Sequence, residues 1–287
     1  MSIQIKELTH IYSENLPYHQ VALDSVSFEV ADGEFFGIIG HTGSGKSTLV
    51  QHLNGLLKPK SGHILINGAD ITRGDIPMRQ IRQKVGLVFQ YPEYQLFEES
   101  VYKDVAFGPA NLGLSAEDVE NNVREAIELV GLDFDEIKER SPFELSGGQK
   151  RRAAIAGVLA MKPEILILDE PTAGLDPKTH NDMLNMLKDI HRKTGKITVL
   201  VSHNMSDIAN YCDRIAVLEK GKLLMEGSAA EVFKNRERLS ASGLDVPPVM
   251  ELLSRLSAGG LDVRTELFSV AEGADEIADA LKKRRRI

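Results

Sequence analysis

A buried strand that runs directly into a glycine-rich loop is the feature that most constrains the fold of this chain. Residues 35–39 read Phe-Phe-Gly-Ile-Ile, an uninterrupted apolar run of the kind found in strands buried on both faces. Residues 40–48 then read Gly-His-Thr-Gly-Ser-Gly-Lys-Ser-Thr. Beyond the loop, leucines recur at helical spacing, namely Leu49, Leu53, Leu56 and Leu57. This order of strand, loop and helix is the setting that a phosphate-binding loop requires.

The loop fills every position of the phosphate-binding pattern, which ends in glycine, lysine and a hydroxyl residue. Its glycines let backbone N–H groups wrap around phosphates, and the following helix presents its positive N-terminus to them. We expect Lys46 to meet the β and γ phosphates and Ser47 to ligate Mg²⁺. The glycine spacing G-x-G-x-x-G is absent, which argues against a dinucleotide fold. The expected nucleotide-binding residues of the loop are Gly40, His41, Thr42, Gly43, Ser44, Gly45, Lys46, Ser47 and Thr48.

Two acids, Asp169 and Glu170, end another strand that we expect to be buried, at residues 165–168. A carboxylate in such a place can hold Mg²⁺ beside the phosphate loop, and the next can orient or deprotonate a water in line with the γ-phosphate. We assign the first role to Asp169 and the second to Glu170. Taken alone the two acids would be solvated strand-end residues, but their combination with Lys46 favours catalysis.

A second anion-facing loop, Leu145-Ser146-Gly147-Gly148-Gln149, lies about a hundred residues after the first. It opens a predicted helix, so it also offers free N–H groups and a helix dipole to an anion. No Gly-Lys-Ser/Thr adjoins it. The chain therefore carries two phosphate-facing loops and one lysine able to complete a nucleotide site.

The remaining pattern alternates strands with helices, which predicts a parallel sheet wound with helices. Further buried strands are expected at 85–89 and 197–201, and Val26, Phe28 and Val30 alternate as in a half-buried strand. A hairpin is expected at 214–219 and 222–226. Ser228 and Glu231 have capping-box spacing for a following helix. Helices are expected at 119–130, 149–160 and 178–192, then from Pro247-Pro248 to Gly259-Gly260, and around Ile277, Ala278 and Leu281.

Composition narrows the functional class. The net charge of -8 argues against general nucleic-acid binding, which needs a basic face. One basic cluster, Lys282 to Arg286, could touch anionic lipid or a partner, although a solvated helix end is favoured. The single cysteine, Cys212, permits no intrachain disulfide and suits a reducing cytosol. The first residues do not form a secretory signal, and no apolar run approaches the length of a membrane helix.

Taken together, the motifs resemble those of ATP-binding cassette (ABC) ATPases over roughly residues 1–230. Besides the phosphate loop, the signature at 145–149 and the acidic strand end, Gln90 follows a strand as the family's Q-loop does. Residues 173–176, Ala-Gly-Leu-Asp, match the D-loop, which ends at Asp176, and His203 follows Val-Leu-Val-Ser as the switch histidine does. All six motifs occur in the family's order.

The resemblance implies a fold and a set of roles. The fold is α/β, a P-loop NTPase cassette with a parallel sheet core, an antiparallel β subdomain and a helical subdomain at about 91–160. Residues 1–227 would form this nucleotide-binding domain, and 228–287 a small helical domain that contributes a dimer contact. ATP and Mg²⁺ are implied as ligands, with Glu170, His203 and Gln90 catalytic, and Ser47, Gln90 and Asp169 around Mg²⁺. Tyr12 resembles the aromatic residue that stacks on adenine, with Tyr18 as a competitor.

The family's arrangement also explains the second loop. Two cassettes pair head to tail, and each ATP lies between the phosphate loop of one and the signature of the other. The signature residues expected to serve a partner's nucleotide are Ser146, Gly147, Gly148 and Gln149.

Three segments are similar to those of energy-coupling factor (ECF) transporter ATPases, in particular to the second of two paralogous subunits. They are residues 89–99, Phe-Gln-Tyr-Pro-Glu-Tyr-Gln-Leu-Phe-Glu-Glu, then 104–109 and 243–248. The resemblance implies a heterodimer with a paralogous ATPase, a transmembrane coupling subunit and a membrane protein that captures a vitamin or metal ion. Glu98 and Glu99 could meet arginines of the coupling subunit, or form a solvated acidic turn. The chain would then lie peripherally on the cytoplasmic face of the cell membrane.

Other classes of phosphate-loop protein fit less well. An ATPase of an ordinary ABC importer is the main alternative. Soluble ABC ATPases of DNA maintenance or translation usually carry a coiled-coil insertion or two cassettes, and neither is visible here. A nucleotide kinase would not explain the signature, Gln90 and His203 together.

Overall fold

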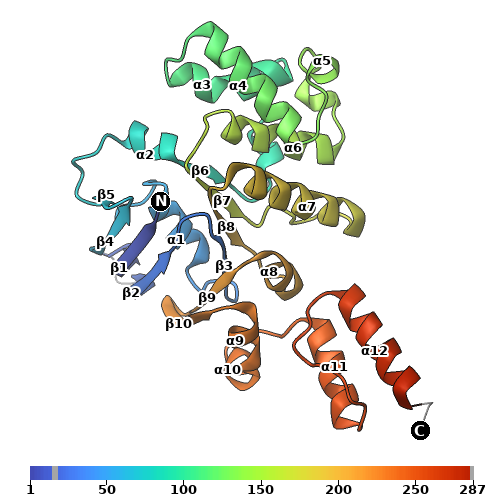
Figure 1. Ribbon diagram of the computed structural model, residues 1–287. Coiled ribbons are helices and arrows are strands. Elements are labelled where there is room, and N and C mark those ends of the chain that lie inside the picture. Colours follow the sequence, from blue (N-terminus) through green and yellow to red (C-terminus); the bar gives the residue numbers. More distant parts are fainter. Residues whose placement is uncertain (15–18, 285–287) are drawn as a thin grey trace.

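A six-stranded sheet and a four-stranded sheet form the centre of the molecule in the computed structural model, which describes residues 1–14 and 19–284 (Figure 1). The larger sheet is parallel except at one edge, where β10 pairs antiparallel with β9. Its order is β10 (Lys222–Gly227), β9 (Arg214–Glu219), β3 (Phe35–Ile39), β8 (Ile197–Val201), β7 (Ile165–Asp169) and β6 (Val85–Val88). The α/β fold with a parallel core is therefore confirmed.

Continuous apolar sequence produces the central strands. Every residue of β3, β6, β7 and β8 is buried, as expected of strands covered on both faces. Successive side chains of β7 point to opposite faces. Ile165 and Ile167 join the core beneath the smaller sheet, whereas Leu166 and Leu168 join the core on the helical side.

The smaller sheet is antiparallel throughout, as the family resemblance implied. Its order is β2 (Gln20–Val30), β1 (Ile3–Tyr12), β4 (Ser61–Ile66) and β5 (Ala69–Asp70). Val26, Phe28 and Val30 are buried and alternate with exposed residues, which matches the predicted period of two. The pairing of β1 with β2 is interrupted on both sides of His10, so the strand is irregular before it ends at Tyr12.

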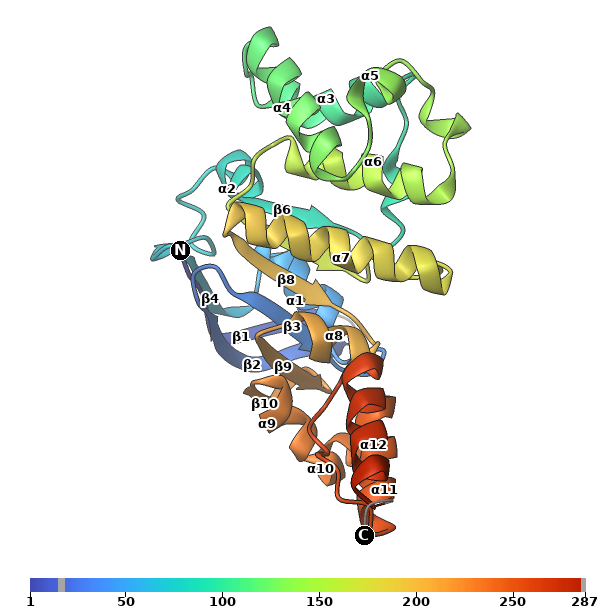
Figure 2. The ribbon, with the colours of Figure 1, turned by 45° about the vertical axis from the view of Figure 1, so that its right-hand side comes forward.

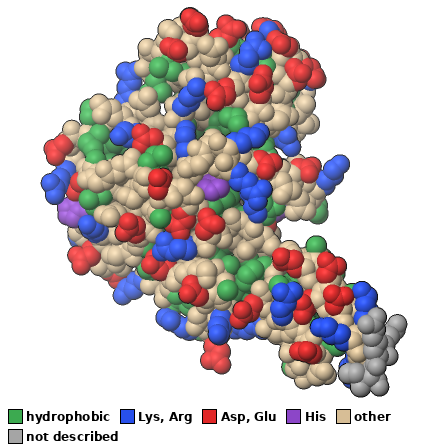
Figure 3. All heavy atoms as spheres, in the orientation of Figure 1, with side chains coloured by type: hydrophobic (Ala, Val, Ile, Leu, Met, Phe, Trp, Pro, Cys, Tyr) green, Lys and Arg blue, Asp and Glu red, His purple; other side chains and the backbone are tan. Residues whose placement is uncertain are grey.

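Helices gather at the two ends of the molecule and against the sheets. In both ribbon views α3 to α6 lie at one end and α10 to α12 at the other, with the sheets between them (Figures 1 and 2). Basic and acidic side chains are interspersed on the face shown in Figure 3. The first helices are α1 (Lys46–Leu53), α2 (Met78–Lys84), α3 (Val101–Asn111), α4 (Ala116–Leu129), α5 (Phe134–Ile137), α6 (Gly147–Leu159), α7 (Pro177–Thr194) and α8 (Met205–Tyr211), with 3-10 turns η1 (Pro92–Gln95) and η2 (Pro142–Glu144).

The sequence-based prediction of where the first helix ends was wrong. The leucine spacing predicted a helix that includes Leu56 and Leu57, but α1 ends at Leu53. Gly55 adopts a left-handed conformation with φ 69°, and the N–H groups of both leucines turn back to the Gln51 carbonyl. Such a C-terminal cap satisfies carbonyls of the last turn and ends the helix, while the chain still carries apolar residues.

The part of the chain after β10 is helical. It consists of α9 (Ala229–Lys234), α10 (Arg236–Ala241), α11 (Pro248–Ala258) and α12 (Val270–Arg284). The predicted capping box forms at the start of α9, between Ser228 and Glu231. Of the basic cluster, Arg285 and Arg286 lie outside the described residues. Over residues 1–14 and 19–284, none of the helices is both long and apolar enough to cross a bilayer.

Candidate active site

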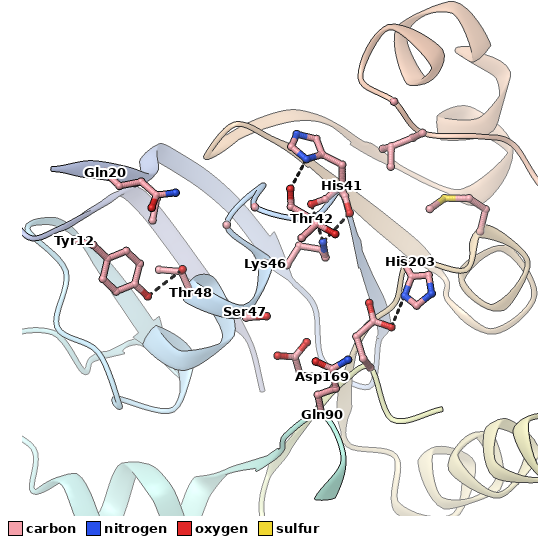
Figure 4. A pocket seen from close by; sticks show the side chains of 18 of the residues that line it. Tyr12, Gln20, His41, Thr42, Lys46, Ser47, Thr48, Gln90, Asp169 and His203 are labelled. Carbon is pink, nitrogen blue, oxygen red and sulfur yellow. Dashed lines mark hydrogen bonds and ion pairs between the residues drawn. The ribbon is translucent and has the colours of Figure 1, made fainter. Parts of the chain in front are cut away.

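Four neighbouring strands of the large sheet end at one edge, and the loops that follow them form a pocket of about 720 Å³ (Figure 4). Strand β3 leads into the phosphate loop, β6 into Gln90, β7 into Glu170 and β8 into His203. Residues more than a hundred positions apart in the chain therefore meet, because parallel strands place their carboxyl ends together. The predicted residues that line the pocket are Tyr12, Gly40, His41, Thr42, Gly43, Gly45, Lys46, Ser47, Thr48, Gln90, Asp169, Glu170 and His203.

Backbone geometry fixes the phosphate loop. Gly45 has φ 103°, and a β-carbon there would approach the carbonyl oxygen of Ala22 to 2.4 Å, so only glycine fits. Helix α1 begins at the next residue, with its N-terminus directed at the loop. Ser44 is fully buried beneath the loop. The loop therefore has the form that phosphate binding requires.

Lys46 folds back over its own loop. Its Nζ donates to the carbonyl of Gly40 at 2.6 Å and to that of His41 at 3.1 Å. Burial lowers the pKa of Lys46, and the nearby carboxylates of Glu170 and Asp169 oppose that effect. The Lys46 cation therefore lies over the phosphate loop, where it was predicted.

Asp169 lies beside Ser47, and both were predicted to bind the same Mg²⁺ ion. Its side chain is buried, and burial together with the charge of Glu170 raises the pKa of the Asp169 carboxyl, whereas the Ser47 hydroxyl and Lys46 act in the opposite direction. Gln90 lines the same pocket (Figure 4). A carboxylate, a hydroxyl and an amide are oxygen donors of the kind that Mg²⁺ accepts. The donor set therefore fits Mg²⁺.

Glu170 and His203 form a hydrogen-bonded pair across the ends of β7 and β8. Nδ1 of His203 lies 2.7 Å from Oε2 of Glu170. Glu170 has a left-handed backbone with φ 51°, and its N–H donates to the Val201 carbonyl at 3.0 Å. A strained backbone that is held in place from a neighbouring strand is often found at active sites. The Glu170 side chain is 14% exposed and that of His203 is 74% exposed, so the pair spans the pocket wall and its open side.

Tyr12 stands at the end of the pocket away from the acids. Its hydroxyl lies 3.2 Å from Oγ1 of Thr48 and its ring is partly exposed (Figure 4). The competing residue, Tyr18, lies outside the described residues.

The signature and the D-loop are elsewhere. Ser146 and Gln149 form a capping box at the start of α6, and Asp176 caps α7 by accepting from the N–H groups of Lys178 and Thr179. A β-carbon on Gly147 would meet no atom within 4 Å, so that position is open. Among the described residues that line the pocket, neither the signature (Ser146, Gly147, Gly148, Gln149) nor Asp176 is included.

A buried arginine fixes the signature helix to the Q-loop side of the site. Arg151 of α6 is 2% exposed, and its guanidinium donates to both carboxylate oxygens of Glu93. It also donates to the carbonyls of Pro171 and Ala173, which follow the acidic strand end. Three motifs are thus joined through one side chain.

The pocket also contains residues that the motifs did not predict. Gln20 and Ala22 come from β2, Met205 is the first residue of α8, and Leu244 and Asp245 come from the loop between α10 and α11. Residues 243–248 were noted only for their ECF-like sequence, which carries no sign of contact with nucleotide. After β10 the chain folds back, so that the loop between α10 and α11 lies against the pocket. The position of this loop depends on the tertiary fold and could not be predicted from a local motif.

Comparison with known proteins agrees with this geometry. A family model described as ABC transporter matches residues 23–173. The energy-coupling factor transporter ATP-binding protein EcfA2 of Caldanaerobacter subterraneus subsp. tengcongensis is 54% identical over 287 residues, which covers 100% of both chains.

Solved structures are similar over most of the chain. CbiO1 from Clostridium perfringens, described as part of the ABC transporter complex CbiONQ, has a TM-score of 0.74 and 36% identity, over 88% of this chain and 98% of that one. A dimeric post-hydrolysis structure of the ATP-binding cassette MJ0796 bound to ADP and phosphate has a TM-score of 0.69 and 29% identity, over 79% of this chain and 98% of that one.

Proposed function

We propose a transport function for this chain, which belongs to the ABC transporter family of ATP hydrolases, among the ATP-binding proteins of energy-coupling factor transporters. In this proposal it powers the uptake of vitamins or metal ions through a membrane coupling subunit. Hydrolysis of ATP is supported by one observation: Lys46, Asp169 and the Glu170–His203 pair all line the same pocket. A capture subunit in the membrane would supply the transported solute.

The residues divide the work on ATP by position. The loop N–H groups and Lys46 bind the phosphates, and Tyr12 stacks on adenine at the far end of the pocket. Ser47, Gln90 and Asp169 would hold Mg²⁺, which when bound neutralises charge on the phosphate oxygens. Glu170 accepts a proton from the attacking water, and His203 holds the Glu170 carboxylate in place through its 2.7 Å contact.

The signature is assigned to a partner's ATP. Ser146 to Gln149 lie outside the pocket of their own chain and open α6, whose N-terminus can meet an anion. The partner would be a paralogous ATPase, with residues 228–287 forming a helical domain that contacts it. The two subunits would form a heterodimer with two composite sites.

A groove on the helical side suits the membrane coupling subunit. It has a volume of about 670 Å³ and lies between α2, α3 and α6, beside the segment that follows Gln90. Phe97 and Phe107 are exposed in it and pack edge to face, with ring centres 5.1 Å apart. Glu98 and Glu99 adjoin this aromatic pair and would meet basic residues of the membrane subunit. The chain would accordingly lie peripherally on the cytoplasmic face of the membrane.

The decisive experiment replaces the proposed base in the assembled complex. Glu170→Gln should leave ATP binding intact and reduce turnover by about 100-fold or more. Glu219→Gln is the matched control, because Glu219 ends strand β9 of the same sheet and is absent from the described lining of the pocket. Undiminished hydrolysis by the Glu170 variant would remove it from the mechanism.

The trans assignment is tested by mixing subunits. A Ser146→Arg chain paired with a partner whose own phosphate-loop lysine is changed to alanine should lose only one composite site, because both changes fall on the site that contains the partner's loop. When the Ser146→Arg chain is paired with an unaltered partner, the complex should lose only the composite site that contains the partner's phosphate loop. Loss confined to the loop of the Ser146 variant would overturn the assignment.

Identification of the co-purifying membrane subunits separates the two transport classes. An ECF complex should contain one coupling subunit and a small capture protein in the membrane. Recovery of the paired permease subunits of an ordinary ABC importer would instead support the alternative.

A further inference from the structure

Two histidines lie outside every motif of the cassette and connect two parts of the nucleotide pocket. His10 is in β1, two residues before Tyr12, and His52 is in α1, four residues after Thr48. Nδ1 of His10 lies 3.1 Å from Nε2 of His52. The strand that carries the adenine-stacking residue is therefore bonded to the helix that starts in the phosphate loop.

The same contacts form a closed ring of side chains. Nδ1 of His52 lies 2.7 Å from the Thr48 carbonyl oxygen, and the Tyr12 hydroxyl lies 3.2 Å from Oγ1 of the same residue. The His10 ring packs edge-on against both Tyr12 and His52, with centroid distances of 4.5 and 4.6 Å. Tyr12 is therefore linked to Thr48, the last residue of the phosphate loop, in two ways: directly through its hydroxyl, and indirectly through His10 and His52.

Hydrogen-bond chemistry fixes the direction of the histidine link. The Thr48 carbonyl only accepts, so His52 must carry its proton on Nδ1. Burial lowers the pKa of His52, and the charge of His10 adds to that effect, while the Thr48 and Lys58 backbone contacts oppose it. A neutral His52 has a lone pair on Nε2, and the Nδ1–H of His10 therefore donates to it.

The arrangement has a cost that a purely structural core would avoid. His52 is 1% exposed, and Nε2 of His10 is buried with no hydrogen-bond partner among the residues that the structure describes. Buried polar atoms without partners destabilise a fold, and an apolar pair of the same size would remove that penalty. A function in the site is one reason for such a group to be present.

We propose that His10 and His52 are positioning residues for ATP, which set the place of the Tyr12 ring relative to the phosphate loop. The inference rests on the proposed role of Tyr12 in stacking on adenine. Adenine and the phosphates occupy opposite ends of the pocket, so the distance between Tyr12 and the loop must match the length of the nucleotide. The pair acts on binding of the adenosine part and leaves the γ-phosphate chemistry unchanged.

The test is titration calorimetry of the full chain with two probes, ATP and inorganic tripolyphosphate, each with Mg²⁺. Tyr12→Ala should weaken ATP about tenfold, since loss of base stacking has that order of effect. His10→Leu should weaken ATP about three- to tenfold and leave tripolyphosphate unchanged. His10→Asn, whose amide can donate from the position of Nδ1, should recover most of the affinity.

A double substitution gives the sharpest outcome. If His10 acts through Tyr12, His10→Leu should have no further effect on ATP in a Tyr12→Ala chain. In the assembled complex it should raise KM for ATP and leave kcat within about twofold. His63→Ala is the matched control, because this histidine lies in the neighbouring strand β4 and pairs with Asp70 at the surface.

The outcomes separate the two proposals. An unchanged ATP affinity in Tyr12→Ala would refute the stacking role itself. Weakened binding in Tyr12→Ala with unchanged binding in both His10→Leu and His10→Asn would refute the positioning role alone. The positioning role would also be refuted if His10→Leu reduced ATP affinity equally in the presence and absence of Tyr12. It would likewise be refuted if His10→Leu weakened tripolyphosphate binding as much as ATP binding. If His10→Leu fails to fold, the same comparisons apply to His10→Asn, whose affinity must then stay near that of the unaltered chain.

Discussion

Replacement of Glu93 by glutamine should destabilise the chain strongly, because it leaves the Arg151 cation buried without its counter-ion. Arg151 is 2% exposed and its partner's side chain is 17% exposed. Removal of one member of a buried ion pair typically costs about 3–5 kcal/mol. Glutamine keeps one acceptor oxygen, so we expect about 2–3 kcal/mol here. For a chain of this size that corresponds to a melting temperature lower by about 3–5 °C.

The measurement is a thermal melt of the full chain followed by calorimetry, with Glu99→Gln as the matched control. Glu99 pairs with Lys103 four residues later, but its side chain is 84% exposed. Exposed pairs of this kind contribute little, so the control should melt with the unaltered chain. Equal melting temperatures for the two variants would refute a stabilising ion pair at Arg151.

The same pair predicts the response to acid. Burial alone would raise the pKa of Glu93, but the hydrogen bonds and charge of Arg151 outweigh it and hold the pKa below its usual value. The stability that the pair contributes is therefore complete above the ordinary glutamate pKa of about 4.3 and is lost as pH falls through the lower folded value. The difference in unfolding free energy between the unaltered chain and Glu93→Gln should therefore decrease as the pH falls through that range. A difference that stays constant with pH would contradict a stabilising Glu93–Arg151 pair.

Three further outcomes follow from single positions. Gly45→Ala should weaken ATP by at least about tenfold, because its β-carbon would meet a carbonyl oxygen at 2.4 Å, whereas Gly43→Ala, with open space around it, should do less in the same titration. Cys212 is buried and burial raises its pKa, so iodoacetamide should label it far more slowly in the folded chain than in denaturant, as measured by mass spectrometry. Ser228→Ala should cost about 1 kcal/mol by loss of the α9 cap, and an unchanged denaturant midpoint would argue against that cap.

The central strands and the motifs that follow them were predictable because their signals are local. A strand covered on both faces is nearly continuous in apolar residues, and β3, β7 and β8 have that sequence apart from Asp169 and Thr198. The phosphate loop is likewise determined by its own glycines and lysine. Chemistry that occupies consecutive residues can be read before the fold is known.

Features that oppose a local pattern, or that depend on contacts between distant segments, were not predicted. The end of α1 is set by the cap at Gly55, which opposes the leucine spacing. Helix α3 continues through Pro109, although proline usually interrupts a helix interior. His10 and His52 are 42 residues apart, and neither belongs to a motif. Only the packing of β1 on α1 gives them a shared role.

The loop between α10 and α11 makes the nucleotide pocket a property of the whole chain. Leu244 is buried, and with Asp245 it lines the pocket that contains Lys46 and His203. A chain shortened to end after β10 would keep every motif of the cassette and still lose part of the wall around ATP. Nucleotide affinities measured on such a fragment would describe a different, more open site, so comparison with other cassettes needs the intact polypeptide.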